Sequence, residues 1–159
     1  MNTAENLDSQ VRIIPGDERM LFLPRHFGNL MMVAENTTYN IANKVLKVAD
    51  TAGNLKPYVG GYWEYAIAPS GAPFMFLDND RDVEVTNPLS GESQALSPVV
   101  GGVVISMLTL QAIFSSQVFE SLSDTRSDDL IDRYHNLLND GYALARDDAE
   151  KTAFFRLTD

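Results

Sequence analysis

Residues 62–86 read YWEYAIAPSGAPFMFLDNDRDVEVT and contain three short β-type runs separated by turns. In residues 62–68 the side chains alternate, with Trp63, Tyr65 and Ile67 on one face and Glu64 on the other. The turn PSGAP separates this run from residues 74–77, and an acidic turn at 78–82 precedes residues 83–86. The pattern predicts a three-stranded antiparallel meander.

Helical signals surround this predicted meander on both sides. Asn29 is placed to cap a helix running to about residue 49, and Ser97 followed by Pro98 starts a helix that extends to about residue 122. Ser127 caps the next helix, and Asp147 caps a last one ending near residue 157. The sequence therefore predicts an α+β fold, a three-stranded antiparallel meander packed against about four helices.

The N-terminal part of the chain carries weaker signals. Residues 1–16 are mostly polar and end in Pro15-Gly16, which predicts a flexible tail before a single domain at residues 17–159. The apolar run at residues 20–23 precedes Pro24, which favours an extended conformation there. The tail lacks the basic and apolar segments of a signal peptide, so we expect a cytoplasmic protein.

Composition excludes several classes of function. The 159 residues include no cysteine, which removes disulfides, thiol nucleophiles and cysteine-based metal sites. The net charge is −10, and no basic patch is visible, so direct nucleic-acid binding is not expected. The uncharged stretch after Glu92 contains Gly101-Gly102 and several hydroxyl side chains. One face at helical spacing combines small and polar residues: Gly102, Ser106, Thr109, Ser116 and Glu120. This stretch is predicted to be a central core helix that a neighbour approaches closely, rather than a membrane span.

His26 is the first candidate for chemistry. Beside Arg25 its charged form is disfavoured, which suits a neutral base, and Glu35 or Glu64 could complete a small hydrolase site. No serine or cysteine nucleophile sits in a recognisable turn, and two histidines are too few for zinc. Packing of His26 and Phe27 at the start of a helix is the favoured interpretation, which leaves no catalytic residue, no metal and no cofactor.

Residues 60–65, GGYWEY, are the second candidate. Gly60-Gly61 precedes a strand rather than a helix, so it is not a phosphate-binding loop. Alternation favours Trp63 as a structural residue and leaves Tyr62 and Tyr58 outside, with Tyr62 the better candidate for recognition. Glu64 is expected to pair with an arginine of residues 18–28, either Arg25 or Arg19.

Four runs together resemble one protein family. ERMLFLPRHFG at residues 18–28, MMVAEN at 31–36, GGYWEY at 60–65 and LIDRYHNL at 130–137 are similar to the KlcA/ArdB antirestriction family, and the resemblance extends from residue 18 to 159. It implies a non-enzymatic protein of plasmids and other mobile elements that protects incoming foreign DNA by inhibiting type I restriction enzymes. The signature positions are Arg25, His26, Phe27, Gly28, Glu35, Gly60, Gly61, Trp63 and Glu64.

The resemblance leaves the contact surface and the partner open. From Glu120 onward the chain carries ten acids and five bases, which suggests an acidic face for a basic partner. Candidate contact residues are Tyr62, Asp148 and Asp159, with Asp147 and Glu150 serving also as a helix cap. The expected partner is the type I restriction enzyme or an associated host factor. The alternatives are the small hydrolase and a non-catalytic regulatory binding module of a mobile element.

Overall fold

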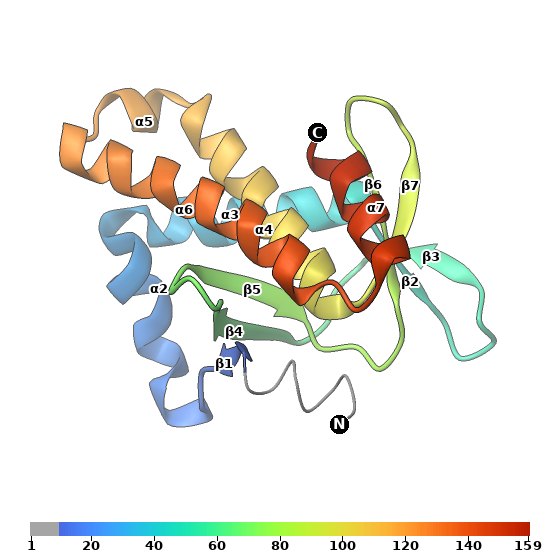
Figure 1. Cartoon of the computed structure of the whole chain (residues 1–159). Coiled ribbons are helices and arrows are strands. Elements are labelled where there is room, and N and C mark those ends of the chain that lie inside the picture. The colour runs from blue at the N-terminus through green and yellow to red at the C-terminus, as the bar shows by residue number, and fades with distance from the viewer. Residues whose placement is uncertain (1–9) are drawn as a thin grey trace.

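Two antiparallel sheets and a layer of helices make up the computed structural model, which describes residues 10–159 (Figure 1). The first sheet has the order β1-β4-β5, with β1 at Arg12–Ile13, β4 at Trp63–Ile67 and β5 at Pro73–Leu77. The hairpin of β4 and β5 pairs Trp63 with Leu77 and Ile67 with Pro73. The predicted pairing of these two runs is confirmed.

The second sheet has the order β3-β2-β6-β7, with β2 at Leu46–Ala49, β3 at Leu55–Pro57, β6 at Val83–Thr86 and β7 at Ser93–Leu96. The predicted three-stranded meander is therefore wrong in its third strand. β6 leaves the β4–β5 hairpin and pairs with β2, where Leu46 faces Val85 and Lys47 faces Glu84. The amino group of Lys47 lies 4.0 Å from the Glu84 carboxylate, so the pairing also joins opposite charges.

Helix α4, Pro98–Phe114, lies at the centre of the molecule between α3 (Met31–Val45) and α6 (Asp124–Leu144) and packs over β5 (Figure 1). Gly102 and Ser106 of the predicted stripe admit a close neighbour as expected, whereas Ser116 and Glu120 lie beyond the end of α4. Gly102 lies against the backbone of β5 at Met75 and Phe76, and the Ser106 hydroxyl accepts a hydrogen bond from the Met75 amide at 3.2 Å. Ser106 thus satisfies the open edge of β5. In the part of the chain that the structure describes, no helix is long and apolar enough to cross a bilayer.

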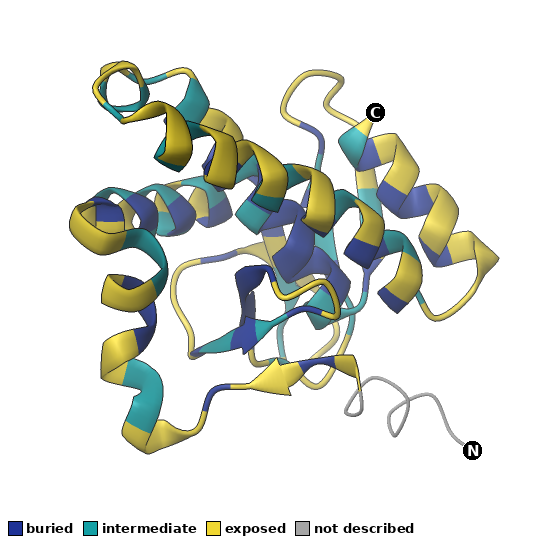
Figure 2. Ribbon diagram, turned by 60° about the vertical axis from the view of Figure 1, so that its left-hand side comes forward, coloured by how far each residue is buried: buried dark blue, intermediate teal, exposed yellow. Residues whose placement is uncertain are grey.

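The remaining helices cover the outside. α7, Asp148–Thr158, packs on β7, and the short α5, Gln117–Glu120, connects α4 to α6. Buried positions of α3, α6 and α7 face the interior, and their exposed positions form the outer surface (Figure 2). This is the amphipathic pattern that surface helices need to bury one side.

Residues 20–23, expected to be extended, are helical. They belong to α2, Arg19–Phe27, which follows the short helix η1 at Gly16–Glu18 and precedes η2 at Gly28–Leu30. Pro24 lies inside α2, where it removes only the hydrogen bond that an amide would make to the Met20 carbonyl. Phe22 and Leu23 are buried by the helix, and this burial offsets the lost bond.

Four helix boundaries also differ from the prediction. Asn29 does not cap α3, because its side chain accepts a hydrogen bond from Arg126 Nη1 at 2.8 Å. The helix predicted to reach residue 49 ends at Val45, and the next residues form β2. Ser123 rather than Ser127 caps α6, its hydroxyl accepting from the Arg126 amide at 3.3 Å, and α4 stops at Phe114.

The expected tail at residues 1–16 is only partly tested. Residues 1–9 lie outside the described residues. Arg12 and Ile13 form β1 on the edge of β4, and the Ile14 amide donates to the Tyr65 carbonyl at 2.8 Å. Val11 and Ile14 are buried, so the prediction of a loose tail is wrong for residues 11–14.

Candidate functional site

Arg19 joins the two signature runs, residues 18–28 and residues 60–65. Its Nη2 donates to the Trp63 carbonyl at 2.7 Å, and its Nη1 lies 3.7 Å from the Glu64 carboxylate. The guanidinium carbon lies 4.6 Å from the ring centroid of Tyr62 and 4.5 Å from that of Tyr65. Both cation–π contacts and the carbonyl bond therefore hold α2 against β4. Of the two arginines predicted as partners for Glu64, Arg19 is the one that pairs.

His26 lies one turn along α2 from Phe22, with the two ring centroids 4.8 Å apart. Burial of the imidazole lowers its pKa below the ordinary value, and the positive charges of Arg133, Arg25 and Arg12 lower it further. The ring is consequently neutral at pH 7. This state agrees with the predicted packing role as well as with a neutral base.

Trp63 is the core residue of the second signature run. Its Nε1 donates to the Tyr58 hydroxyl at 2.8 Å, and the rings of Tyr39 and Tyr58 lie 6.0 and 5.8 Å from its own. Trp63 is buried, whereas Tyr62 is 55% exposed, as the alternation predicts. Tyr58 was expected outside but is buried, because its hydroxyl is the partner that the indole N–H needs.

Glu35 lies beside two half-buried tyrosines, Tyr39 and Tyr65. Burial, followed by the neighbouring Tyr65 and Glu35, raises the pKa of Tyr39 to about 12. Burial and then Glu35 also raise the pKa of Tyr65, whose ring stacks on Phe22 at 4.7 Å. Both phenols therefore keep their protons near neutral pH. Among residues 10–159, Glu35 makes neither a hydrogen bond nor an ion pair with His26, and Glu64 pairs with Arg19 instead.

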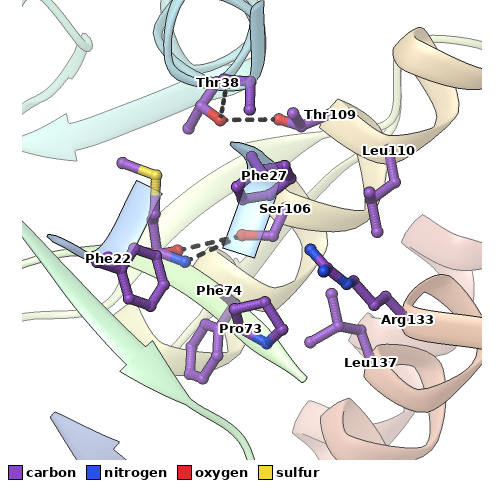
Figure 3. A pocket seen from close by; sticks show the side chains of 12 residues that line it. Phe22, Phe27, Thr38, Pro73, Phe74, Ser106, Thr109, Leu110, Arg133 and Leu137 are labelled. Atoms are coloured by element: carbon purple, nitrogen blue, oxygen red, sulfur yellow. Dashed lines mark hydrogen bonds between the residues drawn. The ribbon is translucent and has the colours of Figure 1, made fainter. Parts of the chain in front are cut away.

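A small apolar cavity lies behind the first signature run (Figure 3). Its volume is about 20 Å³, enough for one water molecule. Arg133 points into it from α6, with the guanidinium carbon 5.3 Å from the Phe27 ring centroid and Nη2 2.9 Å from Asp129. Burial lowers the pKa of Arg133. The cavity is too small for a substrate, so Phe27 and Arg133 act here as packing residues.

A polar groove of about 210 Å³ opens beside His26, between α2, the β4–β5 turn and α6. It contains a serine, Ser70, but the Ser70 hydroxyl donates to Asp140 Oδ2 at 2.6 Å and its amide donates to Oδ1 at 3.1 Å. The hydroxyl is thus committed to a buried carboxylate and not to the imidazole. Within the described residues, no group of three or more His, Asp or Glu side chains is arranged to hold a metal ion.

The signature glycines meet backbone requirements. Gly28 has φ +55° and ends α2, and the adjacent Phe27 carbonyl accepts from Arg126 Nη2 at 2.9 Å. Gly60 has φ +146°, and a side chain at Gly61 would collide with a methyl group of Leu77. These positions fix the path of the chain as it enters α3 and β4.

Comparisons with known proteins agree with this architecture. No protein-family model matches the chain. Over 93 residues it is 28% identical to the putative antirestriction protein YubI of Escherichia coli K12, a match covering 58% of this chain and 59% of that protein. The fold matches a solved structure of the KlcA and ArdB proteins with a TM-score of 0.68 and 26% sequence identity, over 92% of this chain and 93% of that one. In fold and in sequence the chain therefore resembles the KlcA/ArdB antirestriction proteins.

The solved KlcA and ArdB proteins are described as having a novel fold and antirestriction activity against type I DNA restriction systems in vivo but not in vitro. In this chain, the signature runs at residues 18–28 and 60–65 meet the run at residues 130–137 at the junction of α2, β4 and α6. Within residues 10–159, Arg19 and Trp63 of these runs donate hydrogen bonds to protein groups, while the buried Nη1 atoms of Arg19 and Arg133 make none. Among the phenylalanine, tyrosine and tryptophan residues of these runs, Tyr62 is the exposed one.

The acidic candidates of the C-terminal helix separate into two kinds. Asp147 caps α7, its carboxylate accepting from the Glu150 amide at 2.8 Å, as predicted. Glu150 does not belong to a contact surface, because it is only 2% exposed and accepts from the Ser97 amide at 2.8 Å and the Ser97 hydroxyl at 3.1 Å. Asp148 and Asp159 are exposed.

Sequence reasoning missed the arginines that brace the signature runs. Arg126 and Arg133 lie on α6, about a hundred positions after the backbone and side chains that they contact, and no local pattern indicates such contacts. The only available signal was the position of Arg133 inside the run at residues 130–137 that carries the family resemblance.

Proposed function

We propose that this chain protects incoming foreign DNA by inhibiting type I restriction enzymes through protein–protein contact, without catalysing a reaction. The observation that carries the proposal is the likeness of nearly the whole fold, over 92% of the chain, to proteins with antirestriction activity. The signature runs that support the likeness in sequence are also the ones that lock α2 onto β4 through Arg19.

The arrangement of polar side chains supports a non-catalytic role. The hydrolase alternative needs His26 beside a nucleophile or a carboxylate. Ser70, which lines the polar groove with His26, donates a hydrogen bond to Asp140, and Glu64 pairs with Arg19. A reaction would need a rearrangement of these buried bonds.

The partner is a basic surface of the type I restriction enzyme or of a host factor associated with it. Exposed carboxylates at Asp147, Asp148 and Asp159 and the exposed Tyr62 are the contact residues we infer, now without the buried Glu150. Activity of the related KlcA and ArdB proteins in vivo but not in vitro favours a host factor, because a purified enzyme would lack it. The net charge of −10 opposes direct contact with DNA.

Expression of this protein should raise the plating of unmodified phage on a host with a type I restriction system towards the level on a restriction-deficient host. Phage already modified by that system provides the control, because its plating should not change. The measurement is the efficiency of plating at verified soluble expression. Unchanged plating of unmodified phage at that expression would reject the proposed function.

Replacing His26 with alanine should destabilise the fold by about 1 kcal/mol through the lost ring contact with Phe22, and reduce protection only in proportion. The pKa of His26 in the folded state lies below 6.5, its value in the unfolded chain. As the pH falls below 6.5, the unfolded chain therefore binds a proton at His26 more readily than the folded protein does, and the free energy of unfolding decreases. His26→Ala should therefore lose less stability than the wild type between pH 7 and pH 5, measured by urea unfolding.

The exposed histidine on α6 provides the matched control, and His135→Ala should change neither stability nor plating. A His26→Ala variant that keeps the wild-type stability at pH 7 but gives no protection would contradict the packing role. That result would favour the hydrolase hypothesis.

A further inference from the structure

A hollow of about 170 Å³, lined by apolar and polar side chains, lies at the C-terminal end of α7, and we name it the C-terminal groove. It is bounded by the β6–β7 loop, α4, α6 and the last turn of α7. Figures 1 and 2 both show this loop beside the end of α7. Its floor is formed by Val104, Met107, Leu108 and Leu157.

Leu89 stands on the rim of the C-terminal groove with 95% of its surface exposed. The turn that carries it is fixed by Asn87, whose Oδ1 accepts from the Leu89 amide at 2.8 Å and from the Ser90 amide at 3.3 Å. Asn87 Nδ2 in turn donates to the Arg156 carbonyl of α7 at 3.1 Å. A single exposed leucine is ordinary, but here a braced turn presents it next to the open hollow.

Most polar groups around the groove are paired with one another, and the carboxylate of Asp159 is left to bind a cation. The Gln111 amide donates to the Tyr134 hydroxyl at 2.8 Å, so these two rim groups satisfy each other. Arg156 pairs with Glu92 at 3.2 Å. Asp159 is the charged residue that lines the groove, and within residues 10–159 its carboxylate makes no ion pair. An apolar floor with a free carboxylate at its edge is complementary to an apolar side chain flanked by a cation.

We propose that the C-terminal groove binds an apolar side chain of a protein partner that carries a lysine or arginine next to that side chain. The inference rests on the proposed function, since it assigns the contact site and the chemistry of the partner's recognition segment. The apolar side chain packs on Leu89 and Leu108, and the neighbouring cation lies by Asp159. Asp159 differs in this respect from the other exposed acids, because it is the acid among the residues that line the C-terminal groove.

The test titrates the labelled full chain with the peptide acetyl-Lys-Leu-Leu-Lys-amide and follows backbone amide shifts by NMR. Saturable shifts are expected at residues 87–91, 104–111 and 157–159. The Lys-Ser-Ser-Lys and Glu-Leu-Leu-Glu peptides should give none there, because one lacks the apolar side chains and the other lacks the cations. Leu89→Ser should weaken binding about tenfold, the loss of one buried leucine contact.

Two matched variants control the substitutions. Val59→Ser removes an apolar side chain that is 93% exposed elsewhere and should bind the peptide like the wild type. Asp159→Asn should weaken binding, whereas Asp80→Asn, at another exposed acid, should not. Absence of saturable shifts, equal binding of the acidic peptide, or equal effects of the paired variants would overturn the proposal. A concentration-dependent dimer that Leu89→Ser abolishes would also overturn it, since a second copy would then occupy the groove.

Plating separates the groove from the proposed function. If the wild type protects phage and Leu89→Ser and Asp159→Asn protect less, at equal expression, the groove is the contact site. If all variants protect fully, the groove is rejected while the antirestriction function stands. If the wild type gives no protection, the function fails, and the peptide titration alone decides whether the groove binds a cationic apolar segment.

Discussion

Replacing Glu150 with alanine is expected to lower the free energy of unfolding by about 3–5 kcal/mol. The Glu150 carboxylate is buried and accepts hydrogen bonds from the Ser97 amide and hydroxyl and, at 3.2 Å, from the Arg146 amide. The Arg146 guanidinium lies 3.6 Å away. Alanine would leave these partly buried donors without the carboxylate at the point where the first turn of α4 meets α7.

Urea unfolding followed by circular dichroism measures the loss. Asp148→Asn is the matched control, because it removes an exposed carboxylate from the same helical turn and should change stability by less than about 1 kcal/mol. The loss of stability in Glu150→Gln should lie between those of Glu150→Ala and Asp148→Asn. The glutamine oxygen can still accept a hydrogen bond, but its NH₂ group would face another donor. A Glu150→Ala variant as stable as the control would mean that Ser97 and Glu150 do not meet. Protection by Glu150→Ala should decline only as far as the folded fraction does.

The sequence predicted correctly those helices and strands that are determined by residues close to one another in the chain. Ser97 followed by Pro98 started α4, and Asp147 started α7, because a cap needs only its own side chain and an amide three residues later. The β4–β5 hairpin was also found, since alternation and the PSGAP turn lie within fifteen residues.

The misses concern partners that are distant in the sequence. β6 has the same pattern whether it continues the hairpin or joins β2, and the choice is made by Leu46 and Lys47, almost forty residues earlier. Leu46 and Lys47 fit the helical pattern of the preceding residues, so the sequence predicted the residues of β2 to be the end of α3. Ser93–Leu96 has little strand propensity and becomes β7 because β6 and α7 cover it.

The candidate site was predicted as a set of residues but not as a junction. The runs at 18–28 and 60–65 stood out by composition, and Arg19 was one of two partners proposed for Glu64. That Arg19 lies between Tyr62 and Tyr65 depends on α2 being helical, and Pro24 argued against that. The error at Glu150 has a similar origin, because its acceptor role depends on Ser97, fifty-three positions away.

Gly102→Ala is expected to destabilise the protein by about 2–3 kcal/mol, even though alanine favours a helix by about 1 kcal/mol over glycine. A methyl group at Gly102 would overlap the Met75 carbonyl oxygen and the Phe76 backbone, which no rotamer change can move. α4 would have to shift away from β5, and the Ser106 bonds to Met75 would lengthen.

The neighbouring glycine of α4 gives the control for Gly102. At Gly101 the added methyl meets a methyl group of Val83 at 2.8 Å, a side-chain atom that can turn aside, so Gly101→Ala should cost less than Gly102→Ala. Both free energies of unfolding are measured in urea, with unchanged m values as the sign that the native and unfolded states are otherwise the same. If Gly102→Ala were as stable as the wild type, α4 could not lie against the backbone of β5. The role of the small-residue face in covering that strand edge would then be wrong.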